Sequence, residues 1–94
     1  MFEWDPRKAQ ANADKHGVSF DDAVTVFLDT DALDGPDLQH SAKEPRFRRL
    51  GRVTDGRILM VVYTFRRTSH VETIRLISAR RASRRERTAY AAKD

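Results

Sequence analysis

The most constraining feature of the sequence is the stretch at positions 57–65, which is apolar at nearly every position and directly follows Asp55 and Gly56. An Asp-Gly pair between two extended segments is typical of a β-hairpin with a type I′ turn, in which both central residues have positive φ angles. Residues 46–53 are therefore predicted to form the preceding strand. Because residues 57–65 are apolar on both alternating faces, they are predicted to form the central strand of a sheet, covered on both sides. A second turn at residues 66–70 leads to a further strand at 71–78.

Helix signals lie before and after these strands. Asp5, followed by a proline, predicts the start of a first helix, and Gly17 predicts its end in the left-handed conformation. Ser19 caps a second helix, and Ser83 with Glu86 forms a Ser-x-x-Glu capping box that opens a C-terminal helix. The second helix carries apolar residues at the spacing of one helical face, namely Phe20, Ala23, Val24, Phe27 and Leu28.

Together these signals predict an α+β fold with two N-terminal helices, an antiparallel meander of three or four strands and a C-terminal helix. Residues 2–4 are the candidate for the fourth strand, at an edge of the sheet. Residues 30–45 are poor in large apolar side chains, and we predict a surface loop there, either a plain connector or a segment that orders on a partner. A chain of 94 residues is expected to form a single domain over residues 1–94.

The composition excludes several classes of protein. The chain has no cysteine and only three histidines, which excludes a disulfide framework and argues against a structural zinc site. Its first residues are acidic where a signal peptide would be basic, and no apolar run approaches the roughly 18 residues of a membrane span. We therefore expect a cytoplasmic protein without membrane contact, metal or other cofactor.

Charge is distributed unevenly along the chain. Residues 1–45 contain 4 basic and 10 acidic side chains, a net charge of −6, whereas residues 46–94 contain 14 basic and 4 acidic side chains, a net charge of +10. Thirteen of those 14 basic residues are arginine, whose planar guanidinium pairs with phosphate oxygens and stacks on bases. The pattern favours a nucleic acid or another phosphate-bearing partner, and a plain soluble surface is the alternative.

Positive charge is densest at residues 80–87, where five of eight residues are arginine at the end of a strand and the start of a helix. Free backbone N–H groups at a helix N-terminus favour anions, and neighbouring guanidinium groups strengthen phosphate binding. The alternative is a solvated helix surface in which Glu86 relieves the repulsion between arginines.

Motifs of most enzyme classes are absent, including a nucleophile triad, a metalloprotease helix, a Walker loop and a dinucleotide-binding turn. A basic surface can still cleave RNA by letting the 2′-hydroxyl attack its own phosphate, which requires a base, an acid and cations near the phosphorane. His16 is the best acid–base candidate, although a capping or buried histidine is the alternative, and His40 and His70 are weaker candidates. Tyr63 and Tyr90 can stack on a base or donate a proton, but core packing accounts for them more simply.

Two stretches are together more specific than any of these features: Lys-His-Gly-Val-Ser-Phe at positions 15–20 and Ile-Ser-Ala-Arg-Arg-Ala at positions 77–82. With Phe-Glu-Trp-Asp at 2–5, Arg-Phe at 46–47 and Arg-Arg-Glu-Arg at 84–87, they span nearly the whole chain. In these residues the chain resembles the BrnT toxins of bacterial type II toxin–antitoxin systems. It departs from the family in the alanine-rich face of its first helix and in the extra basic charge of Arg48 and Arg49.

The resemblance implies a RelE-like ribonuclease fold and a metal-independent endoribonuclease that arrests translation and growth. It also implies a cognate BrnA-type antitoxin, which neutralises the toxin in a heterotetramer of two toxins and two antitoxins and binds operator DNA. A non-catalytic nucleic-acid-binding co-repressor is the alternative function. A third possibility is a structural partner whose arginines pair with an acidic antitoxin.

Carried over to this sequence, the resemblance makes Lys15, His16, Arg80 and Arg81 the leading catalytic candidates. Arg57, Glu86 and Tyr90 follow them, with Arg57 assigned to RNA binding. The remaining basic residues supply candidates for RNA binding, and we expect this role for Arg52, Arg57, Arg75, Arg84 and Arg85.

Overall fold

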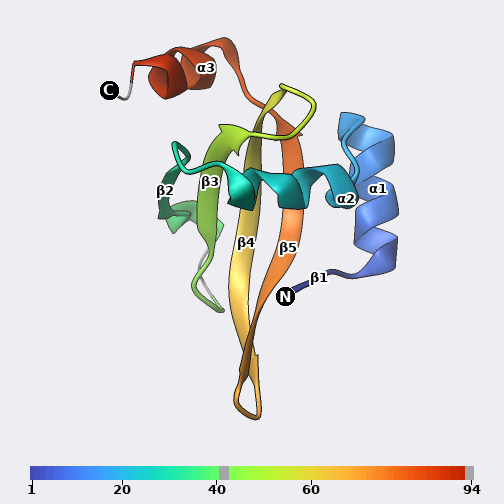
Figure 1. Cartoon of the computed structure of the whole chain (residues 1–94). Helices are drawn as coiled ribbons and strands as arrows, with labels where there is room; N and C mark the ends of the chain where they lie inside the picture. The colour runs from blue at the N-terminus through green and yellow to red at the C-terminus, as the bar shows by residue number, and fades with distance from the viewer. Residues whose placement is uncertain (41–42, 93–94) are drawn as a thin grey trace.

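A computed structural model describes residues 1–40 and 43–92, and these residues form an α+β fold around one sheet (Figure 1). The sheet has the strand order β1-β5-β4-β3-β2. Its strands are β1 (Phe2–Glu3), β2 (Leu33–Pro36), β3 (Phe47–Arg52), β4 (Ile58–Thr68) and β5 (Val71–Arg81). The helices are α1 (Pro6–His16), α2 (Phe20–Ala23) and α3 (Arg84–Ala91), with short 3₁₀ segments η1 (Val24–Leu28) and η2 (Leu38–His40). Within the described residues, no helix has the length and apolar character required to span a bilayer.

The predicted α+β class and both predicted hairpins are confirmed, but the strand count is wrong. The sheet has five strands instead of three or four, and it is mixed because β1 pairs with β5 in parallel, Phe2 opposite Ile74. The additional strand, β2, forms inside the predicted loop and pairs with β3, Leu33 opposite Leu50. It contains a glycine and a proline, residues depleted in strands, so the sequence carries little local strand signal there.

The turn before β4 differs from the predicted type. It is closed by the Gly56 N–H, which donates to the Val53 carbonyl at 2.9 Å. Gly56 has a φ of 96°, but Asp55 does not have a positive φ. A type I′ turn requires positive φ at both central residues, so the hairpin is confirmed and its turn type is not.

The two predicted N-terminal helices are confirmed only in part. α1 begins and ends as expected, with the Asp5 side chain accepting the Arg7 N–H at 2.8 Å and Gly17 in the left-handed conformation. The second helix is only four residues long and continues as the 3₁₀ segment η1. Because a 3₁₀ segment has three residues per turn, Val26 enters the core, while Leu28 is 73% exposed.

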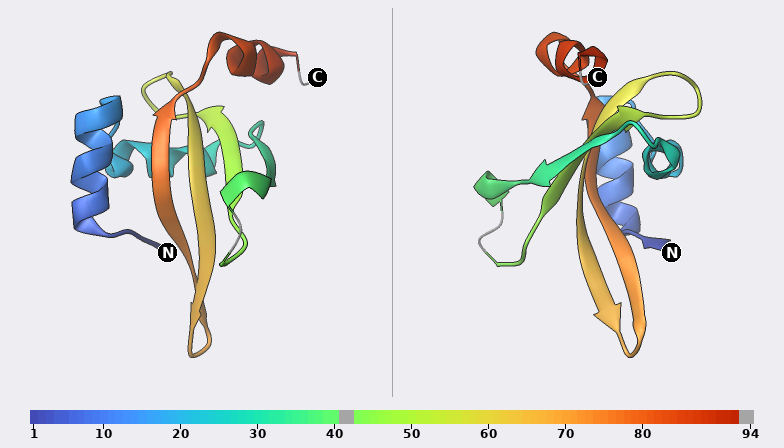
Figure 2. Two further views of the ribbon diagram at one scale, coloured as in Figure 1. Left: turned by 180° about the vertical axis from the view of Figure 1, so that it is seen from behind. Right: turned by 60° about the vertical axis from the view of Figure 1, so that its left-hand side comes forward.

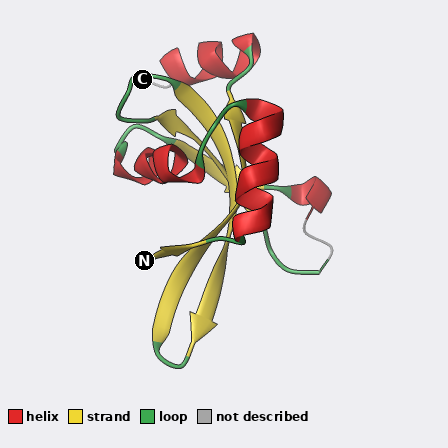
Figure 3. Ribbon diagram, turned by 90° about the vertical axis from the view of Figure 1, so that its right-hand side faces the viewer, coloured by secondary structure: helices red, strands yellow, loops and turns green. Residues whose placement is uncertain are grey.

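The two faces of the sheet are covered differently. One face packs against α1, α2 and η1. Its core includes Val18 from the connection between α1 and α2, Phe20 and Val26 from α2 and η1, and Leu59 and Val61 from β4. On the opposite side, β2 and η2 turn away from these helices (Figure 2), and α3 lies beyond the end of the sheet (Figure 3). The middle of this second face, which we call the open face, is not covered by a helix layer.

Asn12 of α1 is buried and closes the outer edge of β5. Its amide nitrogen donates to the carbonyls of Ala79 and Val18 at 2.8 and 3.1 Å, and its amide oxygen accepts the Ala79 N–H at 3.0 Å. The side chain thus takes the place of a neighbouring strand and satisfies both backbone groups of Ala79. This contact fixes α1 against β5 and thereby places the C-terminal end of α1.

Asn12→Ala is expected to lower the free energy of unfolding by about 2–3 kcal/mol, because it leaves buried backbone groups without partners. In a domain of this size the loss corresponds to a fall in Tm of roughly 10–20 °C. Thermal unfolding checks this expectation, with Gln10→Ala on the exposed side of the same helix as the control, expected to change stability by less than about 0.5 kcal/mol. Equal Tm values for the two variants would contradict the role assigned to Asn12.

Candidate functional site

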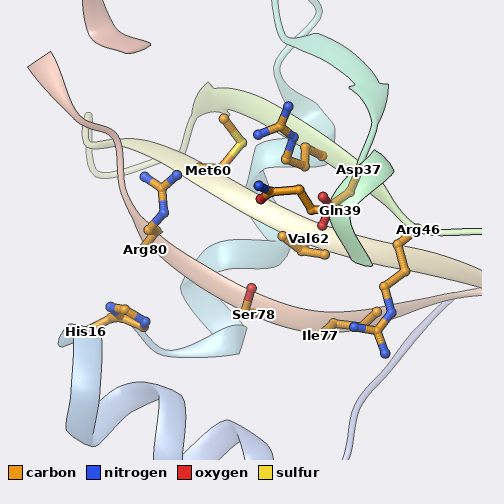
Figure 4. A pocket seen from close by; sticks show the side chains of 10 residues that line it. His16, Asp37, Gln39, Arg46, Met60, Val62, Ile77, Ser78 and Arg80 are labelled. Carbon is orange, nitrogen blue, oxygen red and sulfur yellow. The ribbon is translucent and has the colours of Figure 1, made fainter. Parts of the chain in front are cut away.

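The open face carries a hollow of about 420 Å³. The C-terminal residue of α1, His16, contributes to its wall, together with the segment around η2, and side chains of β4 and β5 form its floor (Figure 4). We call it the central hollow, and its lining residues are His16, Asp37, Gln39, Arg46, Arg48, Met60, Val62, Ile77, Ser78 and Arg80. A histidine and three arginines therefore converge here with one carboxylate, which is an arrangement suited to an anion.

A β-bulge in β5 decides which side chains enter the central hollow. Val62 of β4 lies opposite Ser78 and Tyr63 lies opposite Leu76, so Ile77 is the extra residue. Ile77 and Ser78 both line the hollow, after which the alternation places Arg80 there and Ala79 in the core. If β5 kept all its residues and alternated regularly from Leu76, with no bulge, Ala79 would point to the open face and Arg80 to the core.

Arg80 is held by the first turn of α3. Its two terminal nitrogens donate to the two carboxylate oxygens of Glu86 at 2.7 and 2.9 Å. Glu86 also accepts the Ser83 N–H at 2.8 Å in a capping box, as the sequence predicts. The hydrogen bonds from Arg80 lower the pKa of Glu86 to about 2, so Glu86 stays ionised and fixes the Arg80 guanidinium. Glu86 therefore acts on the central hollow indirectly, by orienting Arg80.

Glu86→Gln is expected to make the free energy of unfolding depend less on pH in the acid range. The pKa of Glu86 is lowered in the folded state, so its stabilising contribution is complete above about pH 4.5 and disappears as the pH falls toward 2. Because Arg80 is partly exposed, we expect this contribution to be about 1 kcal/mol. Glutamine preserves the capping box and removes only the charge. Urea unfolding at pH 7 and pH 3 measures the difference, and parallel pH dependences of the two proteins would refute it.

Arg81 and Arg57 lie away from the central hollow. Arg81 lies opposite Leu59, whose side chain packs in the core beneath the helices. The side chain of Arg81 therefore leaves the strand on the helix-covered face of the sheet. Arg57 pairs with Asp55 at 2.7 Å and with Asp22 of α2 at 3.0 Å. The hydrogen bond from Arg57, with a smaller contribution from the charge of Arg81, lowers the pKa of Asp55. The structure therefore separates the neighbours Arg80 and Arg81, which the sequence places in one cluster.

The side chains of Tyr90, which belongs to α3, and Arg52, at the end of β3, lie against each other outside the central hollow. Tyr90 is buried, and its hydroxyl donates to Asp29, while the Arg52 guanidinium lies 5.7 Å from the centre of its ring. Burial and the hydrogen bond to Asp29 raise the pKa of Tyr90, which disfavours its ionisation. These contacts attach α3 to the sheet through a cluster with Leu50 and Met60.

The remaining predicted residues lie outside the central hollow. Lys15 is exposed on the last turn of α1, next to His16. Arg75 forms an ion pair with Glu3 of β1, and Arg84 and Arg85 are exposed at the start of α3. Of the weaker candidates, His70 is exposed at the turn between β4 and β5, and the side chain of His40 lies outside the described part. Tyr63 is buried and donates to Asp34, and burial raises its pKa.

Sequence reasoning missed several residues that line the central hollow, above all Arg46, Arg48 and Ser78. Alternation along β3 separates Arg48 from Arg49, whose guanidinium binds Asp34 and the carbonyls of Val26 and Asp29 on the other face. The alternation of side chains along a strand could therefore have shown from the sequence that Arg48 and Arg49 lie on opposite faces of the sheet. No local pattern in the sequence marks the bulge that brings Ser78 into the hollow.

Among residues 1–40 and 43–92, no three His, Asp or Glu side chains gather as a metal site would require.

Comparisons with known proteins agree with this architecture. Residues 4–86 match the model of a family described as the ribonuclease toxin BrnT of a type II toxin–antitoxin system. The structure is similar to the crystal structure of the Brucella abortus ribonuclease toxin BrnT, with a TM-score of 0.64 and 28% sequence identity. The similarity covers 89% of this chain and 99% of the Brucella chain. No curated protein sequence gives a significant match.

Proposed function

The chain belongs to the BrnT family of ribonuclease toxins from type II toxin–antitoxin systems, and from this premise we propose that it cleaves RNA in the central hollow without a metal ion. The observation that carries the proposal is the convergence of His16 with Arg46, Arg48 and Arg80 in one hollow of the open face. Cleavage of this kind arrests translation and growth.

The proposed reaction is an internal transfer of the phosphoryl group. The 2′-hydroxyl of the substrate loses its proton and attacks the adjacent phosphorus, and the bond to the 5′-oxygen of the next nucleotide breaks. The products are a 2′,3′-cyclic phosphate and a 5′-hydroxyl, so no water is consumed in this step. A phosphorane with additional negative charge forms on the way, and fixed cations stabilise it more than they stabilise the starting diester.

His16 and Arg80 have different roles in this reaction. Neutral imidazole accepts a proton near physiological pH and its protonated form returns one, so His16 serves the proton transfers. Arg80 stabilises the phosphorane, and its ion pair with Glu86 holds its orientation before substrate binds. Arg46 adds positive charge at the opposite end of the hollow (Figure 4).

A type II toxin has an antitoxin partner, and for this chain we propose a BrnA-type antitoxin. Two toxins and two antitoxins form the inhibited complex, and the antitoxin contributes the binding of operator DNA. The uneven charge of the chain supports separate contacts with RNA and protein, since acidic residues dominate positions 1–45 and arginines dominate the remainder.

The test of the proposed chemistry is an analysis of product ends. The purified chain is incubated with single-stranded RNA in the presence of excess EDTA, and the ends of the fragments are identified. Fragments with 2′,3′-cyclic phosphate and 5′-hydroxyl ends support the proposal. Cleavage that stops in EDTA and returns with added divalent metal would contradict metal independence, and tight RNA binding without fragments would favour the co-repressor function.

A further inference from the structure

Arg48 occupies a special position on the open face. It is exposed, and its side chain makes no hydrogen bond or ion pair with any residue in the described part of the chain. It lines the central hollow and also two smaller cavities beside it, of about 270 and 320 Å³. Arg48 therefore borders all three cavities, the proposed cleavage site among them.

The cavity of 270 Å³, which we call the side cavity, differs in character from the central hollow. Apolar side chains of β2, β3 and β4 line it, namely Leu33, Leu50 and Met60. Its two carboxylates are already engaged, because Asp34 binds Tyr63 and Arg49, and Glu86 binds Arg80. With those charges paired, the side cavity suits the flat apolar face of a nucleobase better than a phosphate.

The register of the sheet separates Arg48 from Arg80. Arg48 lies opposite Val62, which lies opposite Ser78, so Arg48 is two strands away from Ser78. Two strand spacings and the two residues from Ser78 to Arg80 place the Cα atoms of the two arginines about 12 Å apart. Side chains that start at this separation can hold two different phosphates of one RNA strand.

On the basis of the proposed function, we propose that Arg48 binds the phosphate next to the scissile one and that the side cavity takes the base of that neighbouring nucleotide. The substrate is then a single strand of at least three nucleotides, held at two consecutive phosphates. Arg48 contributes binding energy away from the reacting bond, so its removal raises KM more than it lowers kcat.

The experiment compares one dinucleotide with two trinucleotides, extended by one nucleotide at the 5′ or the 3′ end. In the wild-type protein one of the two extensions should raise kcat/KM by about tenfold, which is the size expected for one charged hydrogen-bonding contact. Arg48→Ala should abolish this gain, and it should lower cleavage of the dinucleotide much less than cleavage of the extended substrate. Arg67→Ala, in the exposed arm of β4, is the control and should retain the gain. An extension that carries an abasic nucleotide should give the wild-type protein a smaller gain in kcat/KM, because the side cavity then has no base to bind.

Two results would overturn the proposal: an equal loss on the dinucleotide and the trinucleotides, which would place Arg48 at the scissile phosphate, or no loss on any substrate. Binding of a 2′-O-methyl hexanucleotide, which cannot be cleaved, separates this proposal from the proposed function. If Arg48 holds one phosphate, the salt dependence of log Kd becomes shallower by about 0.7 in Arg48→Ala. That change would support the Arg48 site even if the wild-type protein cleaved nothing, and an unchanged slope would contradict it.

Discussion

Arg80→Ala is expected to lower kcat/KM for RNA cleavage by about 10²–10³-fold, the loss found when a single donor to a developing oxyanion is removed. Arg80 lines the central hollow, and Glu86 holds its guanidinium through two hydrogen bonds. The truncation removes a cation whose interaction is stronger with the phosphorane than with the diester. The effect should therefore fall mainly on kcat.

Arg81→Ala is the matched control for this experiment. It removes the same side chain one residue further along β5, where the strand presents its other face. We expect cleavage by Arg81→Ala to stay within about threefold of the wild type, with only a small loss of affinity from the lower net charge. Initial rates on a labelled single-stranded RNA measure both variants. Equal losses of cleavage rate for Arg80→Ala and Arg81→Ala would contradict this expectation. They would show that cleavage depends on positive charge near the end of β5, whichever face of the sheet carries it.

His16→Ala is expected to lower kcat by about 10²–10⁴-fold, the usual contribution of general acid–base catalysis. Affinity for an RNA that cannot be cleaved should change much less, because the arginines of the central hollow carry most of its positive charge. His70→Ala is the control, since His70 is exposed at the turn between β4 and β5. Circular dichroism of both variants verifies that the fold is retained.

Two outcomes separate the roles of His16. A folded His16→Ala protein with unchanged kcat would exclude this residue from catalysis. A parallel loss of affinity and rate would indicate that His16 acts as part of the binding wall. A selective loss of kcat is the result that the proposed mechanism requires.

Local signals predicted the elements that carry strong capping or hairpin chemistry. Asp5 and Gly17 bound α1, Ser83 and Glu86 form the predicted capping box, and the Asp-Gly pair lies at the predicted hairpin. In each case the residue type satisfies a backbone requirement within a few positions. Such requirements are visible in the sequence because they do not depend on the rest of the fold.

Features that depend on distant partners were predicted less well. β2 lies inside the predicted loop and exists because β3 offers it a pairing edge. β1 lies at an edge of the sheet as predicted, but it pairs with β5 in parallel rather than as part of an antiparallel meander. The apolar character of residues 57–65 predicted a strand covered on both faces. In the structure, Met60 and Val62 form part of the floor of the central hollow instead. An apolar floor for a ligand and an apolar contact with a second layer give the same sequence pattern.

The candidate site was predicted in its chemistry more than in its geometry. The excess of arginine indicated an anionic partner, and His16 and Arg80 do meet in one hollow. The bulge at Ile77 is set by pairing with β4, so the sequence could not show which of the neighbours Arg80 and Arg81 faces the open side. Arg48 of β3 and Arg46, just before β3, lie more than thirty residues before Arg80 in the chain, and only the fold brings them close to it.

Induced expression of the chain in bacteria, with growth and the integrity of total RNA followed over time, tests RNA cleavage in the central hollow. Wild type, Arg80→Ala and Arg81→Ala are compared at equal levels of soluble protein. We expect growth arrest with fragmented RNA for the wild type and Arg81→Ala, and normal growth with intact RNA for Arg80→Ala. Growth arrest with fragmented RNA in Arg80→Ala would contradict cleavage in the central hollow, as would normal growth and intact RNA in the wild type.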